Sequence, residues 1–490
     1  MTRRGGFPVA LSLLLAAALI KLWLLPLPSS FWVDEMVTAF VVHQGSAHPS
    51  LAVAPQVTAT IYYWLPWAAE RLFGFSEISY RVPSILMMGA ALFLVARLAM
   101  RLIHPEAGWF AVFAALTLRG INYEAADARP YALAMLTAAA GLWFLVRWFD
   151  SARWADAFWF VLSAALLWRV HLINWPFYAV FVAYSVARLW RRDTPVSWKQ
   201  AALAFVVLLA ALVPVLLDAL ALMRDAEAHV ITKPPSLREF GNAFKFLLIA
   251  GCGAGGWLLS RRYHWPRQSS PSVPVLILVL GWWMWHPVSL YAFSWITGNS
   301  VFVPRYLSLS LPGAALAGTL AAAYFVPAGC WRPATLVFAV GVLFMAGDNR
   351  HLFPPHHNSG WREASRKIQQ SGLDAATPVV YPSPFIEAKS PVWRPGNPLP
   401  SFLYCHLQTY PVGGTPYLLP FETSPEAEAY AAKIAAGELA TSGKFYIYGG
   451  DVNDHKWQEW LKSRNELRDW RSRRLGPFGD VDVVLFEKAP

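Results

Sequence analysis

Residues 7–27 read FPVALSLLLAAALIKLWLLPL, an apolar run that contains a single charged residue, Lys21. A helix needs about twenty apolar residues to cross the hydrocarbon core of a membrane, so this run predicts a first span at 7–28. Arg3 and Arg4 precede the run and place its start on the cytoplasmic side. A cleaved signal peptide is the rival interpretation, but no clear small-x-small cleavage site ends the run.

Ten further apolar runs follow, so we expect a polytopic α-helical membrane protein with about eleven transmembrane helices. The composition agrees, because hydrophobic residues make up 56% of the chain and charged residues only 14%. Residues 53–73, between the first two spans, are only moderately apolar and are typical of an interfacial helix that lies on the membrane. The other predicted spans are 80–102, 107–122, 130–149, 155–170, 172–190, 200–222, 241–260, 272–292, 306–327 and 333–346.

Basic residues predict which loops face the cytoplasm. With the N-terminus inside, the short inner segments carry fourteen Lys and Arg, against ten on the longer outer segments before residue 346. This bias agrees with the positive-inside rule. It also accounts for the net charge of +11 without a nucleic-acid partner, because the cations lie between apolar runs, near lipid headgroups. An odd number of spans then places the C-terminus outside.

Residues 347–490 are Pro-rich and more highly charged than the preceding part of the chain. They predict a small extracytoplasmic α/β domain after a transmembrane domain at 1–346, whose first outer loop is 29–79. We expect helices at 361–371 and 425–436, and strands at 377–381, 444–448 and 481–486. The three cysteines, Cys252, Cys330 and Cys405, have no metal-type spacing and predict no disulfide framework.

Ionisable groups at a membrane edge are costly and therefore mark candidate functional sites. Asp34 and Glu35 directly follow the first span, in the segment FWVDE at 31–35. They could be two solvated loop carboxylates. Their aromatic, interfacial surroundings favour a general base instead.

A second cluster lies in the loop between the third and fourth predicted spans, where residues 123–131 read YEAADARPY. Pro130 suits the first position of the fourth helix. Arg129 could form a plain ion pair with its acidic neighbours. It could instead bind a phosphate at the helix start, where backbone N–H groups also point at an anion.

Two more polar sites lie on the same predicted face of the membrane. Arg305 and Tyr306 begin the tenth span, where snorkelling of the arginine to the interface is the simple explanation. His171 lies between the fifth and sixth spans, where a lone histidine is usually structural. Taken together, carboxylates and arginines on one membrane face indicate a site for an anionic, membrane-bound substrate.

These segments resemble the membrane glycosyltransferases with the GT-C fold. The most similar branch includes the protein O-mannosyltransferases, the aminoarabinose transferase that acts on lipid A, and the RgtA/B/C/D-like transferases. Residues 127–133 (DARPYAL) resemble the Glu-Ala-Arg-Pro-Tyr-Ala-Leu motif of this branch, with Asp127 in the place of Glu. The resemblance covers about residues 7–325, and its other segments are Asp34-Glu35, FGFSE at 73–77, YRVPS at 80–84, and Arg305-Tyr306 with LPG at 311–313.

The resemblance implies a sugar donor linked to a polyprenyl phosphate. It also implies a lipid, glycan or protein acceptor that is modified at the outer face of the membrane. The expected location is the inner (plasma) membrane of a bacterium, with the C-terminal domain on the periplasmic side. The resemblance implies no certain cofactor; a divalent metal ion stays open, with no ligand set assigned.

The resemblance also implies roles for the site residues. Asp34 would act as the base on an acceptor hydroxyl, and Glu35 would assist it or help to hold a metal ion. Arg129 and Arg305, with Tyr306, would bind the donor phosphate and stabilise the leaving group as negative charge develops. Attack at the anomeric carbon would invert its configuration. An acceptor that is already an anionic phosphate would need no base, and Asp34 would then position the reacting groups. The implied substrate-binding residues are Glu124, Asp127, Tyr62, Tyr63 and His171.

One segment departs from the family. Many relatives have a His-Pro-Pro segment before the interfacial helix, and Tyr-Tyr follows that segment. Here residues 54–58 read APQVT before Tyr62 and Tyr63, and His48-Pro49 lies in a different register. The contacts of this loop with donor or acceptor therefore stay open.

Two other classes of function compete with a transferase. A transporter or lipid flippase would spread polar groups through the membrane midplane and show discontinuous helices and a repeat. A non-catalytic scaffold gives no reason for the grouping of Asp34, Asp127, Arg129 and Arg305. The position of these groups at one membrane edge favours interfacial chemistry.

Overall fold

The computed structural model describes residues 6–44, 61–225, 234–268, 270–351 and 354–488. The contacts divide the chain into two compact units. The first unit contains residues 1–27 and 60–354, and the second contains residues 28–59 and 355–490. The boundary after residue 346, which the sequence suggests, stays a prediction.

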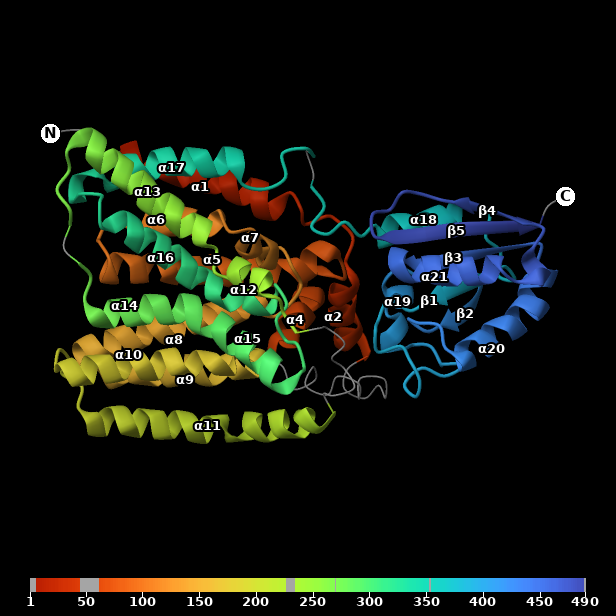
Figure 1. Ribbon diagram of the computed structural model, residues 1–490, viewed down its shortest axis with the longest axis horizontal. Coiled ribbons are helices and arrows are strands. Elements are labelled where there is room, and N and C mark those ends of the chain that lie inside the picture. The colour runs from red at the N-terminus through yellow and green to blue at the C-terminus, as the bar shows by residue number, and fades with distance from the viewer. Residues whose placement is uncertain (1–5, 45–60, 226–233, 269, 352–353, 489–490) are drawn as a thin grey trace. The chain divides into compact units, whose positions relative to one another are not determined.

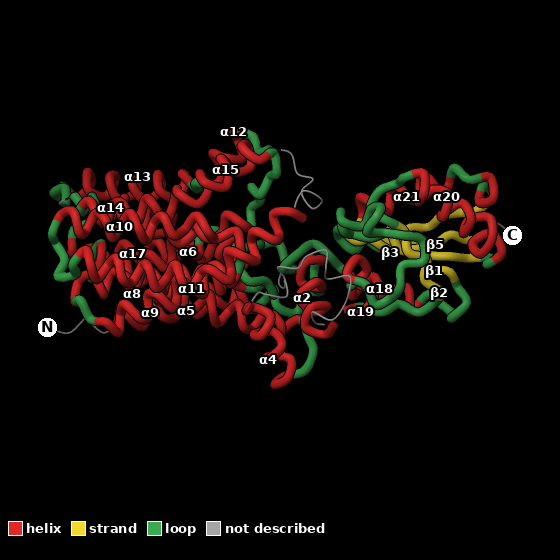
Figure 2. The backbone as a smooth tube through the Cα atoms, turned by 90° about the horizontal axis from the view of Figure 1, so that it is seen from below, coloured by secondary structure: helices red, strands yellow, loops and turns green. Residues whose placement is uncertain are grey.

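The first unit is a helical bundle. Figure 1 shows its long helices running side by side, and Figure 2 shows the same bundle turned by 90°. Short segments with 3-10 or π geometry, labelled η, interrupt the helices of this bundle. Its elements are α1 (Gly6–Leu19), η1 (Ile20–Leu24), η3 (Ile61–Tyr63), α4 (Trp64–Phe73), α5 (Glu77–Leu102), α6 (Gly108–Leu116), α7 (Arg119–Ala125), α8 (Tyr131–Ser151), α9 (Trp154–Val170), η4 (Leu172–Phe177), α10 (Tyr178–Arg191), α11 (Trp198–Asp225), α12 (Leu237–Ala243), α13 (Phe246–Tyr263), α14 (Val273–Leu280), η6 (Gly281–Trp285), α15 (His286–Thr297), η7 (Tyr306–Ser310), α16 (Leu311–Ala323), η8 (Ala328–Cys330) and α17 (Trp331–Met345).

The membrane spans confirm the predicted fold class. Among the described residues, 8 segments are long and apolar enough to cross a membrane, and 9 if α12 and α13, bent by 48°, form one span. The sequence predicts about eleven. The difference lies in 107–122, which forms the two short helices α6 and α7, and in 155–170, which forms α9 with only 17 residues.

Side-chain hydrogen bonds stabilise the break between α6 and α7. The Asn122 amide donates to Leu116 O (2.8 Å) and accepts a hydrogen bond from the Trp23 indole N–H (3.1 Å). The Thr117 hydroxyl donates to Ala114 O (2.7 Å). These bonds satisfy groups that a continuous helix would satisfy through its backbone. A hydropathy pattern does not register them, which is why the sequence predicts one span here.

The interfacial helix that the sequence predicts at 53–73 falls partly outside the described residues. Its described part is η3 and α4. The side chains of Trp64, Trp67 and Phe73 are exposed, and the Arg71 guanidinium lies 5.6 Å from the centre of the Trp67 ring. Exposed aromatic and basic side chains suit the headgroup region, so this role stays a prediction in agreement with the residues seen.

The second unit contains a five-stranded sheet with the strand order β2-β1-β3-β5-β4. β1 is parallel to β2 and β3, whereas β5 is antiparallel to β3 and β4. Figure 2 shows these strands in yellow, with helices around them. The elements are α2 (Val33–Gln44), α18 (Trp361–Gln370), β1 (Pro378–Pro382), η9 (Phe402–Tyr404), α19 (His406–Thr409), β2 (Thr415–Leu419), α20 (Pro425–Ile434), η10 (Ala435–Leu439), β3 (Lys444–Gly450), α21 (Asp451–Lys462), η11 (Asn465–Leu467), β4 (Trp470–Arg474) and β5 (Val481–Lys488).

This sheet confirms the predicted small α/β domain. The predicted helices correspond to α18 and α20, and the predicted strands correspond to β1, β3 and β5. The sequence analysis missed β2, β4 and α21. It also missed α2, which carries Asp34 and Glu35.

Residues of the C-terminal part hold the segment that leads into α2. The Phe31 backbone N–H donates to the Tyr410 hydroxyl (2.7 Å), and the His356 backbone N–H donates to Ser29 Oγ (3.0 Å). The Phe40 ring packs edge-on against Phe402. The carboxylates that follow the first span therefore belong to the second unit.

The first prediction concerns the close packing at Gly313 of α16. A Cβ atom there would lie 2.5 Å from Trp283 N and 2.6 Å from Trp282 C, both backbone atoms of η6. We expect Gly313→Ala to destabilise the bundle by about 1–3 kcal/mol or more, because backbone cannot move aside as a flexible side chain does. The thermal unfolding midpoint of the purified protein in detergent measures this. Gly341→Ala in α17 is the control, since its Cβ would meet no atom within 4 Å; equal midpoints for the two variants would contradict the prediction.

His406 generates a pH prediction for the second unit. Its ring is fully buried, 4.9 Å from the Trp361 ring, and within the described residues neither ring nitrogen has a hydrogen-bond partner. Burial lowers the pKa of His406 to about 3, against about 6.5 in an unfolded chain. The folded state therefore holds His406 in its neutral form. The contribution of this residue to the free energy of unfolding is complete above pH 6.5 and is lost progressively as the pH falls towards 3.

We expect the buried His406 to lower the free energy of unfolding of the second unit by roughly 2 kcal/mol between pH 6.5 and pH 5. Pulse proteolysis of the full-length protein across a denaturant series measures this loss. His406→Phe should flatten the pH dependence, whereas His455→Phe, at an exposed position of the same unit, should leave it unchanged. A wild-type slope in His406→Phe would show that another group is responsible.

Candidate active site

Polar segments that are far apart in the sequence meet in the first unit. The rings of Tyr131, His171 and Tyr306 lie against one another, with centroids 5.7 Å apart for Tyr131 and His171 and 5.2 Å apart for His171 and Tyr306. Tyr131 begins α8, His171 precedes η4, and Tyr306 begins η7. These contacts bring together three sites that the sequence analysis could place only on one membrane face.

Two arginines reach this aromatic group. The guanidinium groups of Arg129 and Arg305 both lie close enough to act electrostatically on the Tyr131 hydroxyl and on the His171 ring. Burial, and then these two positive charges, lower the pKa of His171 to about 3, so the ring is neutral at physiological pH. Positive charge is therefore concentrated on a neutral, largely aromatic surface, which suits an anion.

The carboxylates of the same loop lie beside the arginines. Glu124 and Asp127 are 3% and 1% exposed. The charges of Asp127 and Arg129 both act on the buried Tyr62 hydroxyl, and Tyr62 packs edge-on against Tyr63. Buried carboxylates near guanidinium groups balance part of the positive charge.

The start of α8 positions Arg129. The helix begins at Tyr131 and not at Pro130, which the sequence analysis placed first; Pro130 is the N-cap residue, with φ −72°. A proline lacks the N–H that a helix start leaves unsatisfied, so it fits either position. The shift leaves Arg129 directly before the cap, near the first N–H groups of the helix, which favour an anion. The Tyr131 hydroxyl is buried and makes no hydrogen bond to another described residue.

Hydrogen bonds fix the turn that carries His171. Its Nδ1 accepts a hydrogen bond from the Ile173 backbone N–H (3.3 Å), which caps η4. The Trp168 indole donates to Leu172 O (2.8 Å), and the Asn174 amide donates to Leu167 O (3.2 Å). The ring is thus held by local bonds, as expected for a structural histidine, and still lies against the arginine site.

Asp34 and Glu35 lie in the first turn of α2 in the second unit. Carboxylates in a first turn stabilise a helix through its dipole. Glu35 is fully buried, and its Oε2 accepts a hydrogen bond from the Trp32 backbone N–H (3.3 Å). The Trp32 ring stacks on His357 at 4.2 Å.

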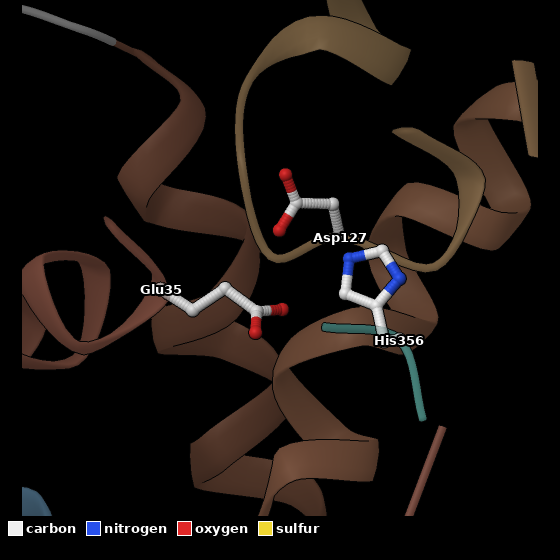
Figure 3. A group of neighbouring side chains, drawn as sticks. All are labelled: Glu35, Asp127 and His356. Carbon is white, nitrogen blue, oxygen red and sulfur yellow. The ribbon is translucent and has the colours of Figure 1, made fainter. Parts of the chain in front are cut away.

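The second unit brings together Glu35 and His356, two residues of the kinds that bind metal ions. A carboxylate oxygen of Glu35 and a ring nitrogen of His356 lie within 4.8 Å of each other. Figure 3 shows the Glu35 and His356 side chains. A carboxylate and an imidazole are ligands for divalent ions such as Zn²⁺ or Mn²⁺.

Some residues near the site were missed by sequence reasoning. His286 lies near His171, and its Nε2 lies 2.9 Å from Tyr306 O. An ionisable residue inside a predicted span is itself a signal of function, which could have identified it. His356 had no such signal, because it lies among prolines and a second histidine in the segment at 354–357.

Comparison with known proteins agrees with this fold. Residues 57–217 match the family model described as dolichyl-phosphate-mannose-protein mannosyltransferase. The crystal structure of ArnT from Cupriavidus metallidurans in the apo state has a TM-score of 0.59 at 14% identity, over 97% of each chain. ArnT from the same organism bound to undecaprenyl phosphate has a TM-score of 0.58 at 12% identity, over 99% of this chain and 98% of that one. No curated protein sequence matches the chain.

These matches confirm the resemblance that the sequence motifs indicate. The chain has a GT-C fold similar to that of the ArnT structures, and its residues 57–217 match the mannosyltransferase family model. The solved structures are similar in fold across both units.

Proposed function

We propose that the chain is a membrane glycosyltransferase that moves a sugar from a polyprenyl-phosphate-linked donor to an acceptor at the outer face of the membrane. The observation that carries this proposal is the convergence of Arg129 and Arg305 on Tyr131 and His171 at the start of α8. The fold supports it, since a solved relative with this fold is bound to undecaprenyl phosphate. The acceptor is a lipid, a glycan or a protein, and the membrane is the inner membrane of a bacterium with the second unit on the periplasmic side.

In the proposed reaction, an acceptor oxygen attacks the anomeric carbon of the donor sugar while the bond from that carbon to the phosphate oxygen breaks. Asp34 takes the proton of the acceptor hydroxyl, and the polyprenyl phosphate leaves with the electron pair. Attack from the side opposite the leaving group inverts the anomeric configuration. An acceptor that is already an anionic phosphate needs no base, and Asp34 then orients it.

Arg129 and Arg305 stabilise the leaving phosphate. Guanidinium groups that are already in place where negative charge develops lower the barrier, because the site needs no rearrangement as the bond breaks. Glu124, Asp127, Tyr62 and Tyr63 contact the substrate or orient the arginines. Glu35 and His356 have the ligand types to help hold a divalent ion, which would supply further positive charge.

A transporter or flippase of the same lipid is the second candidate. It would need the arginines for lipid recognition but would break no glycosidic bond. A carboxylate that is essential for transfer and dispensable for lipid binding distinguishes the two functions.

Asp34 therefore generates a prediction. We expect Asp34→Asn to abolish sugar transfer while the protein stays folded in the membrane and binds undecaprenyl phosphate with wild-type affinity, because the amide is similar in size but accepts no proton. Asp469→Asn, at an exposed position of the second unit, is the matched control and should retain activity. Transfer at the wild-type rate in Asp34→Asn would remove this residue from the mechanism.

The two arginines give a further prediction. We expect Arg129→Met and Arg305→Met each to lower the rate of transfer by roughly 10²–10³-fold, the usual effect of losing one preorganised donor to a developing anion. Arg238→Met is the control, because Arg238 is an exposed arginine on the short helix α12. Rates are measured in membranes with equal amounts of each variant. Undiminished transfer in both site variants would exclude the proposed phosphate site.

A further inference from the structure

The span at Val273–Thr297 contains a π-helical turn. It consists of α14, the π-helix η6 and α15. A π-turn adds a residue to one turn of a helix, changes the direction of the side chains that follow and is frequent at functional sites. In η6 it turns the indole rings of Trp282 and Trp283 inward, where both are buried.

A side chain of this turn and the side chain of the residue directly after it bond to the segment that follows Arg305. The Trp282 indole N–H donates to Leu309 O (2.9 Å), and His286 Nε2 donates to Tyr306 O (2.9 Å). Both acceptors are backbone carbonyls of η7, and Arg305 is the N-cap residue of η7. Two donors from one turn of helix therefore hold the short segment directly after the arginine.

The bond to a carbonyl also fixes the state of His286. A carbonyl oxygen only accepts, so the imidazole carries a proton on Nε2. The His286 side chain is 1% exposed, and Nδ1 makes no hydrogen bond to another described residue. A buried imidazole within a span is costly, and its bond to η7 offsets part of this cost.

Close backbone packing fixes η6 itself. Gly313 of α16 lets the backbone of Trp282 and Trp283 approach without the clash that any Cβ atom would cause. On another side, Gly281 faces the Val180 side chain of α10. The π-turn thus has a defined place between two helices, from which its donors reach η7.

We infer that Trp282 and His286 are positioning residues that hold Arg305 in the direction required to bind the phosphate of the lipid donor. This inference rests on the proposed function. Neither side chain needs to touch the substrate. A preorganised charge is more effective than a mobile one, because no free energy is lost in ordering it when the ligand arrives.

The test measures the affinity of the full-length protein in detergent for undecaprenyl phosphate. We expect Trp282→Phe and His286→Leu each to weaken binding by about tenfold. His286→Gln should recover much of the loss, because its amide can donate to Tyr306 O. Trp283→Phe is the matched control: its indole belongs to the same turn but donates to Phe244 O (2.6 Å), away from η7.

A double-mutant cycle separates positioning from general stability. If His286 acts through Arg305, then His286→Leu should change the affinity less than about twofold when Arg305 is already methionine. Independent, additive effects in this cycle would overturn the inference, and so would equal affinities for Trp282→Phe and Trp283→Phe. Failure of the wild-type protein to bind undecaprenyl phosphate would instead overturn the proposed function.

Discussion

Charged groups at the edge of a membrane lose part of their hydration, which costs free energy unless opposite charges or hydrogen bonds from the fold or from a ligand offset it. This constraint governs the site. The first unit places the positive charges of Arg129 and Arg305 near the same two side chains, Tyr131 and His171. Two like charges held together repel each other. Buried carboxylates compensate part of this cost, and an anionic ligand would compensate the rest.

The fold meets this constraint by interrupting its helices. Tyr62 lies in η3, His171 caps η4, and Tyr306 begins η7, so three short 3-10 segments contribute to one site. Such segments leave backbone groups unsatisfied, and side chains such as the His171 imidazole and the Trp282 indole supply the missing partners. The same interruptions that make the site costly also give it fixed directions, which a reaction with a developing negative charge requires.

Sequence reasoning could predict the features that depend on hydropathy and on local motifs. Most spans, the α/β character of the C-terminal unit and the face that holds Asp127, Arg129 and Arg305 follow from apolar periods and from the order of inner and outer loops. It could not predict the π-turn at 281–285, because the residues that stabilise that turn lie on α16 and η7, far along the chain. It missed β4 since WRSRR is an exposed edge strand without the apolar alternation of a half-buried one. It also missed α2, which packs against residues far along the chain, as Phe40 does against Phe402.

Transfer of a sugar at the cell surface is the central claim, and mass spectrometry of surface lipids, glycans and proteins tests it most directly. Cells with and without the chain are compared, and we predict that one sugar unit is lost from one class of acceptor when the chain is absent. The corresponding polyprenyl-phosphate sugar should then accumulate. Identical surface molecules in both cells, with the lipid carrier displaced across the membrane instead, would contradict a transferase.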